Sequence, residues 1–170
     1  MGYDITISKR KVRDEYDYSE KKSDNEDSHT SDDDDDDYGE NIVANLYMTY
    51  NHCQIFEEYD IYPREFNGKQ IKDILPFYFE AFKKLQNDEE VIERIKENSY
   101  NDYDYSFKKL QNDEEVIEMI KENSYNDYDY SFKYDSNLLY EKTKYSVFLV
   151  VKGVIKKLLN MNQEYYWNSD

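Results

Sequence analysis

An acidic segment near the N-terminus, residues 11–40, limits the fold more than any other feature of this chain. It contains a single Val, no Ile, Leu or Phe, and six consecutive aspartates, Asp32 to Asp37. Residues 1–40 carry 6 basic and 15 acidic side chains, a net charge of −9. Like-charge repulsion with nothing apolar to bury keeps such a segment unfolded. We therefore predict a disordered acidic insert within a single domain formed by residues 1–10 and 41–170.

The acidic excess also limits the partners. The chain has 22 Lys and Arg against 39 Asp and Glu, which gives a net charge of −17. Binding to a phosphate backbone or to anionic lipid is driven by cations, so nucleic-acid and membrane binding are disfavoured. A basic protein, contacted through Asp32 to Asp37, is the charged partner that this composition favours.

Cys53 is the only cysteine, which excludes an internal disulfide and a cysteine-based zinc site within one chain. A lone cysteine suits a reducing compartment. The N-terminal residues lack the apolar stretch of a signal peptide, and the longest apolar run, Val147 to Val151, is too short to cross a bilayer. We expect a soluble intracellular protein that is not secreted and that holds no metal or other cofactor.

Three segments have the composition of strands. Residues 3–8 alternate large and polar side chains, residues 42–50 are rich in β-formers, and Tyr165 to Trp167 are three consecutive aromatic residues near the C-terminus. Helical patterns fill the chain between the last two. Strands at both ends with helices between them predict an α+β fold, in which a small sheet packs against several helices.

Four helical segments are expected in addition to one in each copy of the repeat at 82–131. Two are short, at 54–59 and 69–75, and a longer one at 145–160 carries an apolar stripe. Pro76 suits the first position of a further helix, where its missing N–H costs nothing, and that helix runs to about Gln86. The side chains that it is expected to bury are Phe79, Phe82 and Leu85.

Residues 82–106 are repeated at 107–131 with one difference, Arg94, which becomes Met119. Such near-identity is typical of a recent tandem duplication that the fold tolerates; a repeat with its own binding role is the alternative. We expect one copy to pack against the core while the other extends it or bulges outward. Deleting 107–131 should then leave a folded protein.

Each copy carries the signals of a helix. Asn87 with Glu90, and Asn112 with Glu115, have capping-box-like spacing, in which side chains bond the free N–H groups of a helix start. The apolar stripe is narrow. It consists of Val91, Ile92 and Ile95 in the first copy and of Val116, Ile117 and Ile120 in the second.

Short motifs follow one another in a distinctive order: Thr49-Tyr50-Asn51, Asn67-Gly68-Lys69 and the helix led by Pro76, with Ile55-Phe56, Ala81 and Leu85 between or after them. This order resembles an uncharacterised family of small proteins of Mimivirus-type giant DNA viruses, which has hypothetical relatives in bacteria. Asn98 to Tyr103 resembles a degraded form of the family's N-G-W-G-x-Y loop. The resemblance implies a fold-level grouping, no established activity, and a location in the host cytoplasm or the virion.

Catalytic and metal-binding patterns are weak. His52 and Cys53 are adjacent, and adjacent side chains on an extended chain point to opposite sides, so His52 is badly placed as a base for Cys53. Asp102-x-Asp104-x-Ser106 starts like an EF-hand loop, but Phe107 stands where the turn needs glycine and Asp113 where a glutamate is expected. We therefore predict no catalytic residue and no metal site.

Two modification patterns are present. Met1-Gly2-x-x-x-Thr6 formally matches an N-myristoylation signal, but Tyr3 is bulky and the segment alternates like a strand, which we favour. Ser23, Thr30 and Ser31 each have an acidic residue three positions later. These three are the predicted phosphorylation sites, and each phosphate would add further negative charge to the acidic segment.

Two functional hypotheses follow. The first is a non-enzymatic interaction domain whose acidic segment tethers a basic protein, although the segment could equally be a passive solubilising insert. The alternative is a small enzyme, or an accessory subunit, with a site near Thr49 and Asn51. Short polar side chains at the end of a buried strand often bind a ligand, and Tyr100 and Tyr103 are the further binding candidates. Asn51 has an equally good structural role in holding the turn.

Overall fold

The computed structural model describes residues 2–10, 41–98, 110–122 and 141–169, and it confirms the α+β fold. The strands are β1 (Gly2–Ser8), β2 (Ile42–Thr49), β3 (Lys69–Gln70) and β4 (Tyr166–Ser169). The helices are η2 (Tyr50–His52), α1 (Cys53–Glu58), η3 (Pro63–Phe66), α2 (Ile71–Gln86), α3 (Glu89–Asn98), α4 (Asp113–Glu122) and α6 (Lys144–Leu159). The predicted acidic insert lies outside the described residues, as do the phosphorylation candidates Ser23, Thr30 and Ser31 and the loop residues Tyr100 and Tyr103.

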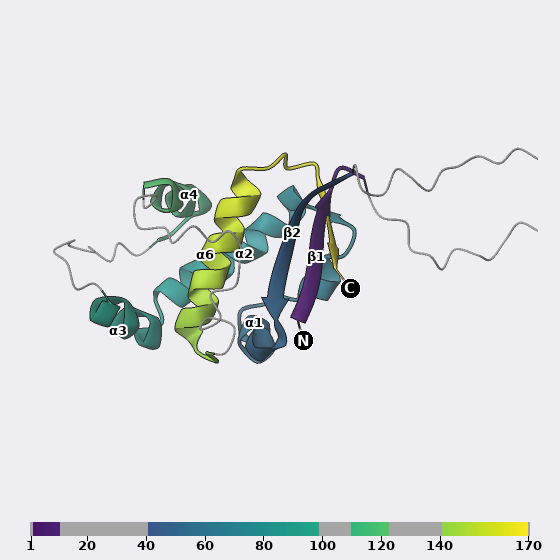
Figure 1. Cartoon of the computed structure of the whole chain (residues 1–170). Coiled ribbons are helices and arrows are strands. Elements are labelled where there is room, and N and C mark those ends of the chain that lie inside the picture. Colours follow the sequence, from purple (N-terminus) through teal and green to yellow (C-terminus); the bar gives the residue numbers. More distant parts are fainter. Residues whose placement is uncertain (1, 11–40, 99–109, 123–140, 170) are drawn as a thin grey trace, which may run out of the picture.

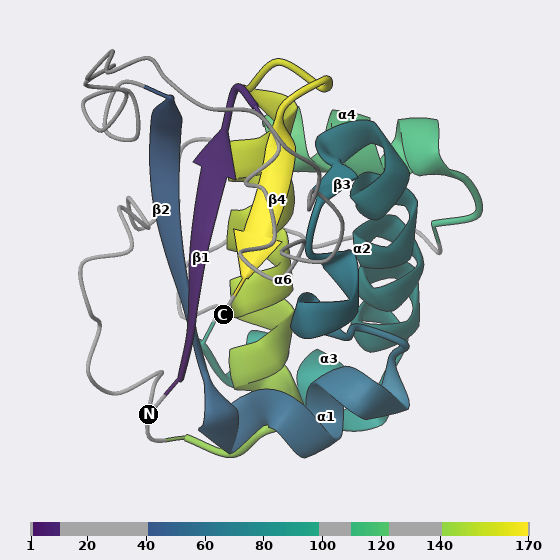
Figure 2. The same ribbon diagram turned by 90° about the vertical axis from the view of Figure 1, so that its right-hand side faces the viewer.

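The strands form one antiparallel sheet in the order β2-β1-β4-β3. β1 and β4, from opposite ends of the chain, lie side by side in its centre (Figure 2). The second predicted strand ends at Thr49, because the chain turns into η2 at Tyr50. β3 replaces the first two residues of the helix predicted at 69–75, whose remaining residues are helical as the start of α2. Gly68 has a positive φ and its N–H donates to the carbonyl of Trp167 at 2.7 Å, which aligns the next two residues with β4.

The sheet buries one apolar face. Alternate residues of a strand share a face, so Ile5 and Ile7 of β1 point the same way as Leu46 of β2 and Trp167 of β4, and all four are buried. The indole N–H of Trp167 donates to the carbonyl of Pro63 at 3.1 Å. The largest fully buried side chain therefore satisfies its only hydrogen-bond donor.

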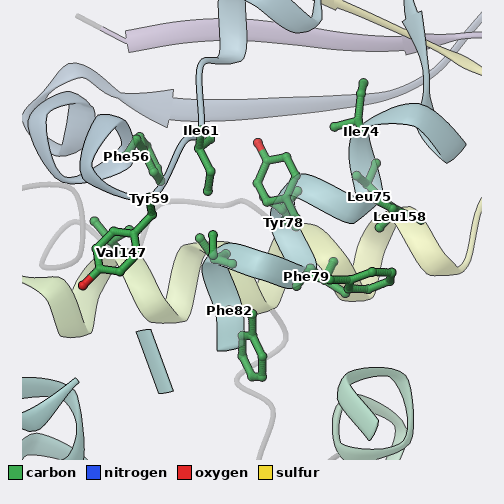
Figure 3. Close-up of a cluster of buried hydrophobic side chains, with 14 of the residues drawn as sticks. Phe56, Tyr59, Ile61, Ile74, Leu75, Tyr78, Phe79, Phe82, Val147 and Leu158 are labelled. Carbon is green, nitrogen blue, oxygen red and sulfur yellow. The ribbon is translucent and has the colours of Figure 1, made fainter. Parts of the chain in front are cut away.

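Helices α2 and α6 form a second layer against this face (Figure 1). Figure 3 shows Ile61 and Tyr78 on the side of these helices that faces the sheet, whereas Phe82 points away from it. Phe82 stacks on Phe148 of α6 with ring centroids 5.1 Å apart. The apolar core therefore continues through the second layer to its far side.

Pro76 lies inside α2, which corrects the prediction that it begins a helix. α2 starts at Ile71, so Pro76 is its sixth residue and removes one backbone hydrogen bond from the helix. Buried side chains lie on both sides of the proline: Ile71, Ile74 and Leu75 before it, and Tyr78, Phe79, Ala81, Phe82, Leu85 and Gln86 after it. The burial of so much apolar surface outweighs the loss of one hydrogen bond.

Helices α3 and α4 belong to the two repeat copies, and they form a third layer beyond α2 and α6 (Figure 1). Val91 of α3 is fully buried, as is Val116 of α4, and Ile120 is almost fully buried. Both copies therefore contribute buried side chains to the core, which fits a second copy that extends the core and contradicts one that bulges outward. A helix of ten residues is marginal on its own, so each copy needs this burial in order to stay helical.

The two copies begin their helices differently. Asn112 caps α4 as predicted, because its Oδ1 accepts a hydrogen bond from the N–H of Glu115 at 2.9 Å. Asn87 instead ends α2, where its Nδ2 donates to the carbonyl of Lys83 at 2.7 Å. Asp88 accepts from the N–H of Glu90 at 3.1 Å and starts α3 in its place. The first copy begins within α2, whose last residues are 82–86, so its asparagine ends that helix.

Candidate functional site

The acidic segment connects two neighbouring strands. β1 and β2 pair antiparallel from Gly2 opposite Thr49 to Ser8 opposite Ile42. Beyond this ladder, the N–H of Lys9 donates to the carbonyl of Asn41 at 2.9 Å. The described residues on either side of the acidic segment therefore lie together at one end of the sheet, where β1 stops and β2 begins.

A cluster of four side chains lies at the opposite end of the same two strands, and we call it the tyrosine–arginine cluster: Tyr3, Tyr50, Cys53 and Arg64. The rings of Tyr3 and Tyr50 meet edge to face, with centroids 4.6 Å apart. The guanidinium of Arg64 lies 5.5 Å from the centroid of the Tyr3 ring and 5.9 Å from that of Tyr50, and its Nη2 donates to the Tyr50 hydroxyl at 3.1 Å. These contacts hold an exposed cation in a defined position.

The surroundings of Tyr3 change its pKa. Its hydroxyl lies 3.2 Å from Sγ of Cys53. Burial and, after it, the hydrogen bond with the thiol raise the pKa of Tyr3 to about 12. Tyr3 therefore stays neutral at physiological pH and offers a hydroxyl rather than a phenolate. The guanidinium of Arg64 has five N–H groups, so the cluster can present cationic donors to a carboxylate or a phosphate.

Thr49 and Asn51, the predicted binding residues, adjoin this cluster. Thr49 is 5% exposed, and its hydroxyl accepts a hydrogen bond from the N–H of Asn51 at 3.2 Å. This contact caps η2, so Thr49 holds the turn that the sequence analysis assigned to Asn51. Tyr3 and Arg64 were missed by the sequence analysis. No spacing in the sequence relates Tyr3 and Arg64 to Tyr50 and Cys53, because the pairing of β1 with β2 brings Tyr3 to this end of the sheet and Arg64 comes from η3.

His52 and Ser146 look at first like a base and a nucleophile. Nε2 of His52 lies 3.3 Å from Oγ of Ser146, but it also lies 2.8 Å from the carbonyl of Glu141. A carbonyl only accepts, so Nε2 carries the proton and cannot take one from Ser146. Ser146 is fully buried and forms a capping box with Thr143 at the start of α6. The pair therefore anchors the start of α6.

Cys53 is half-buried and forms a hydrogen bond with Tyr3, whereas His52 forms one with the carbonyl of Glu141, just before α6. The two adjacent residues thus have different partners. Within residues 2–10, 41–98, 110–122 and 141–169, no group of three or more His, Cys, Asp or Glu side chains could hold a metal ion. The EF-hand-like pattern from Asp102 to Asp113, in which no metal site is expected, lies largely outside these ranges. Among the described helices, none is both long enough and apolar enough to span a bilayer.

Comparisons with known proteins found no match: no family model, no curated protein and no solved structure is significantly similar to the chain. The giant-virus family of the sequence analysis therefore stays a prediction.

Proposed function

We propose that this protein is a non-enzymatic interaction domain that captures a basic protein, with the acidic segment 11–40 as its tether. The observation that supports this most directly is the hydrogen bond between Lys9 and Asn41, which holds the residues that flank the segment at one end of the sheet. The paired strands β1 and β2 are therefore joined by a segment of dense negative charge that includes Asp32 to Asp37. Long-range attraction of this kind speeds the encounter with a cationic partner.

The roles of the reactive side chains support the same proposal. Ser146 serves a helix cap, His52 binds a backbone carbonyl, and the hydroxyl of Thr49 caps η2. Each is a structural role that occupies the group. We place the protein inside the cell, in the host cytoplasm or the virion if it belongs to the giant-virus family, because its single cysteine suits a reducing compartment.

The test measures binding of a synthetic peptide of alternating lysine and serine to the full chain, at low and at high salt. In the first variant all six residues from Asp32 to Asp37 are changed to Asn. The matched control removes six exposed carboxylates elsewhere by changing them to Gln: Glu57, Glu58, Glu89, Glu93, Glu114 and Glu118. We expect the Asn variant to lose most of the salt-sensitive affinity and the control to keep most of it. Equal losses would mean that only net charge matters and would overturn the tether.

The alternative, a small enzyme or accessory subunit with a site near Thr49 and Asn51, is supported by one observation. Arg64 is held over two rings with N–H donors left for an anionic group. Its test is a thermal-shift series with small phosphates and carboxylates on the wild type and on Arg64→Ala. Stabilisation of the wild type alone would favour this function, and the absence of any shift would count against it.

A further inference from the structure

We propose that the basic partner docks by adding an extended strand to the free edge of β2. This inference rests on the proposed function and names the surface that completes it. The partner segment is rich in Lys and Arg, with apolar residues at alternate positions.

β2 is the outermost strand of the described sheet. Its one neighbour there is β1, so in the described part of the chain no strand pairs with its outer edge. Alternate residues of an edge strand direct N–H and C=O groups away from the sheet, where an extended peptide can bond to them. Recognition of this kind, in which a peptide adds a strand to a sheet, gains affinity from the backbone and selectivity from alternate side chains.

The first residues of β2 carry an exposed apolar pair. Ile42 is 43% exposed and Val43 41%, which makes them two of the four large apolar side chains that are exposed in the described residues. The register between β1 and β2 shifts at this point, and Val43 has no partner in β1. A bulge at an edge redirects side chains outward, so this pair is placed to contact a docked strand.

The charge of the chain selects the occupant. Asp37 stands five positions before Ile42, so the aspartate run adjoins the start of the edge in sequence. β2 itself has no charged side chain. A second copy of the chain would bring another net charge of −17 against the first, which disfavours self-pairing. A basic segment instead gains charge attraction at one end of the edge and backbone pairing along it.

Lys157 of α6 limits access to this edge. Its Nζ donates to the carbonyl of Asn45 at 3.4 Å. Lysines at sheet edges are a common protection against unwanted pairing, because an incoming strand must displace them. A docking segment therefore replaces the contact of Lys157 with Asn45 by a backbone hydrogen bond, which makes the edge selective for a partner that the acidic segment has already concentrated nearby.

The experiment uses the full chain and an eight-residue probe of alternating lysine and valine. Two isomers of the probe carry methyl groups on backbone nitrogens, one at every lysine and the other at every valine. Each isomer blocks backbone hydrogen bonding along one edge of the probe strand and leaves its charge unchanged. The edge variant is the double substitution Ile42→Ser and Val43→Ser, and the control is Tyr62→Ser, which alters an exposed aromatic residue away from β2. Amide hydrogen exchange of β2 is followed with and without the probe.

Edge docking predicts that at least one methylated isomer and the edge variant bind about tenfold more weakly, because several hydrogen bonds or apolar contacts are lost. The control should bind like the wild type, and exchange of the β2 amides should slow. If the affinity falls when Asp32 to Asp37 are replaced but is unchanged by probe methylation and by the edge variant, edge docking is overturned and the tether stays intact. Binding that is unchanged when Asp32 to Asp37 are replaced would instead overturn the tether. The methylated probes alone would then test docking at the β2 edge. Absence of binding, or dimerisation of the wild type that the edge variant abolishes, would overturn this proposal.

Discussion

The carboxylate of Asp88 lies 2.8 Å from the ammonium group of Lys144, and this ion pair ties the start of α3 to the start of α6. Asp113, the same residue of the second repeat copy, lies 3.0 Å from Lys83 of α2. One aspartate position therefore anchors each copy to a different helix of the second layer. The two copies therefore have different structural roles.

Asp88→Asn should flatten the dependence of stability on acid pH. Burial raises the pKa of Asp88, but the hydrogen bonds from Lys144, the N–H of Glu90 and Tyr59 outweigh it and hold the pKa below its ordinary value of 3.8. A carboxyl group whose pKa is lowered by folding stabilises the protein above its unfolded pKa, and this contribution is lost as the pH falls below about 4. Urea unfolding from neutral to acid pH measures it. Parallel losses in wild type and variant would contradict the expectation.

Ile120→Ala should cost more stability than Ile95→Ala, although both remove the same side chain from the same position of the repeat. Ile120 is 2% exposed, whereas Ile95 is only half-buried against the core. Truncation of a buried isoleucine costs about 2–5 kcal/mol, and less where solvent already reaches the site. Chemical denaturation of the two variants gives the comparison. Equal losses would mean that the two copies sit in equivalent environments.

The single difference between the copies suits their surroundings, and exchanging the two residues tests this. Arg94 is exposed and pairs with Glu97 at 3.1 Å, whereas Met119 packs against the core and its Sδ accepts from Nε2 of Gln86 at 3.4 Å. Met119→Arg should cost about 1–3 kcal/mol, because it brings a charge against apolar surface. Arg94→Met should stay within about 0.5 kcal/mol. Similar effects of the two changes in thermal unfolding would mean that positions 94 and 119 do not have different surroundings.

Tyr3→Phe should reduce the loss of stability at alkaline pH. The pKa of Tyr3 is raised by burial and by the Cys53 thiol from 10.0 to about 12. A group whose pKa is raised by folding stabilises fully below its unfolded pKa, and that contribution disappears as the pH rises from about 10 to about 12. The pKa values of Tyr59 and Tyr78 are also raised by burial, so the variant keeps part of the decline. Urea unfolding across this range, with tyrosinate absorbance in parallel, would show it. An unchanged alkaline decline would exclude Tyr3 as a contributor.

Local patterns predicted much of the fold. The alternation of residues 3–8 and the β-formers from Ile42 onward became neighbouring strands, and the helix predicted at 145–160 is present as α6. These patterns act between residues a few positions apart, so the sequence contains them. β3 was not predicted, because its two residues form a strand only by pairing with the backbone of β4. The tyrosine–arginine cluster was not predicted for a similar reason, since its four members come from four separate elements.

The sequence by itself determined the α+β class, the strands of the sheet centre and the concentration of negative charge, because alternation and like-charge repulsion need no distant partner. Only the tertiary structure decided what the repeat copies do. Asn87 ends α2 while Asn112 begins α4, and Asp88 and Asp113 bind different lysines. Two segments with nearly the same sequence differ in role because each is stabilised by the surface it buries against, and those surfaces are not the same.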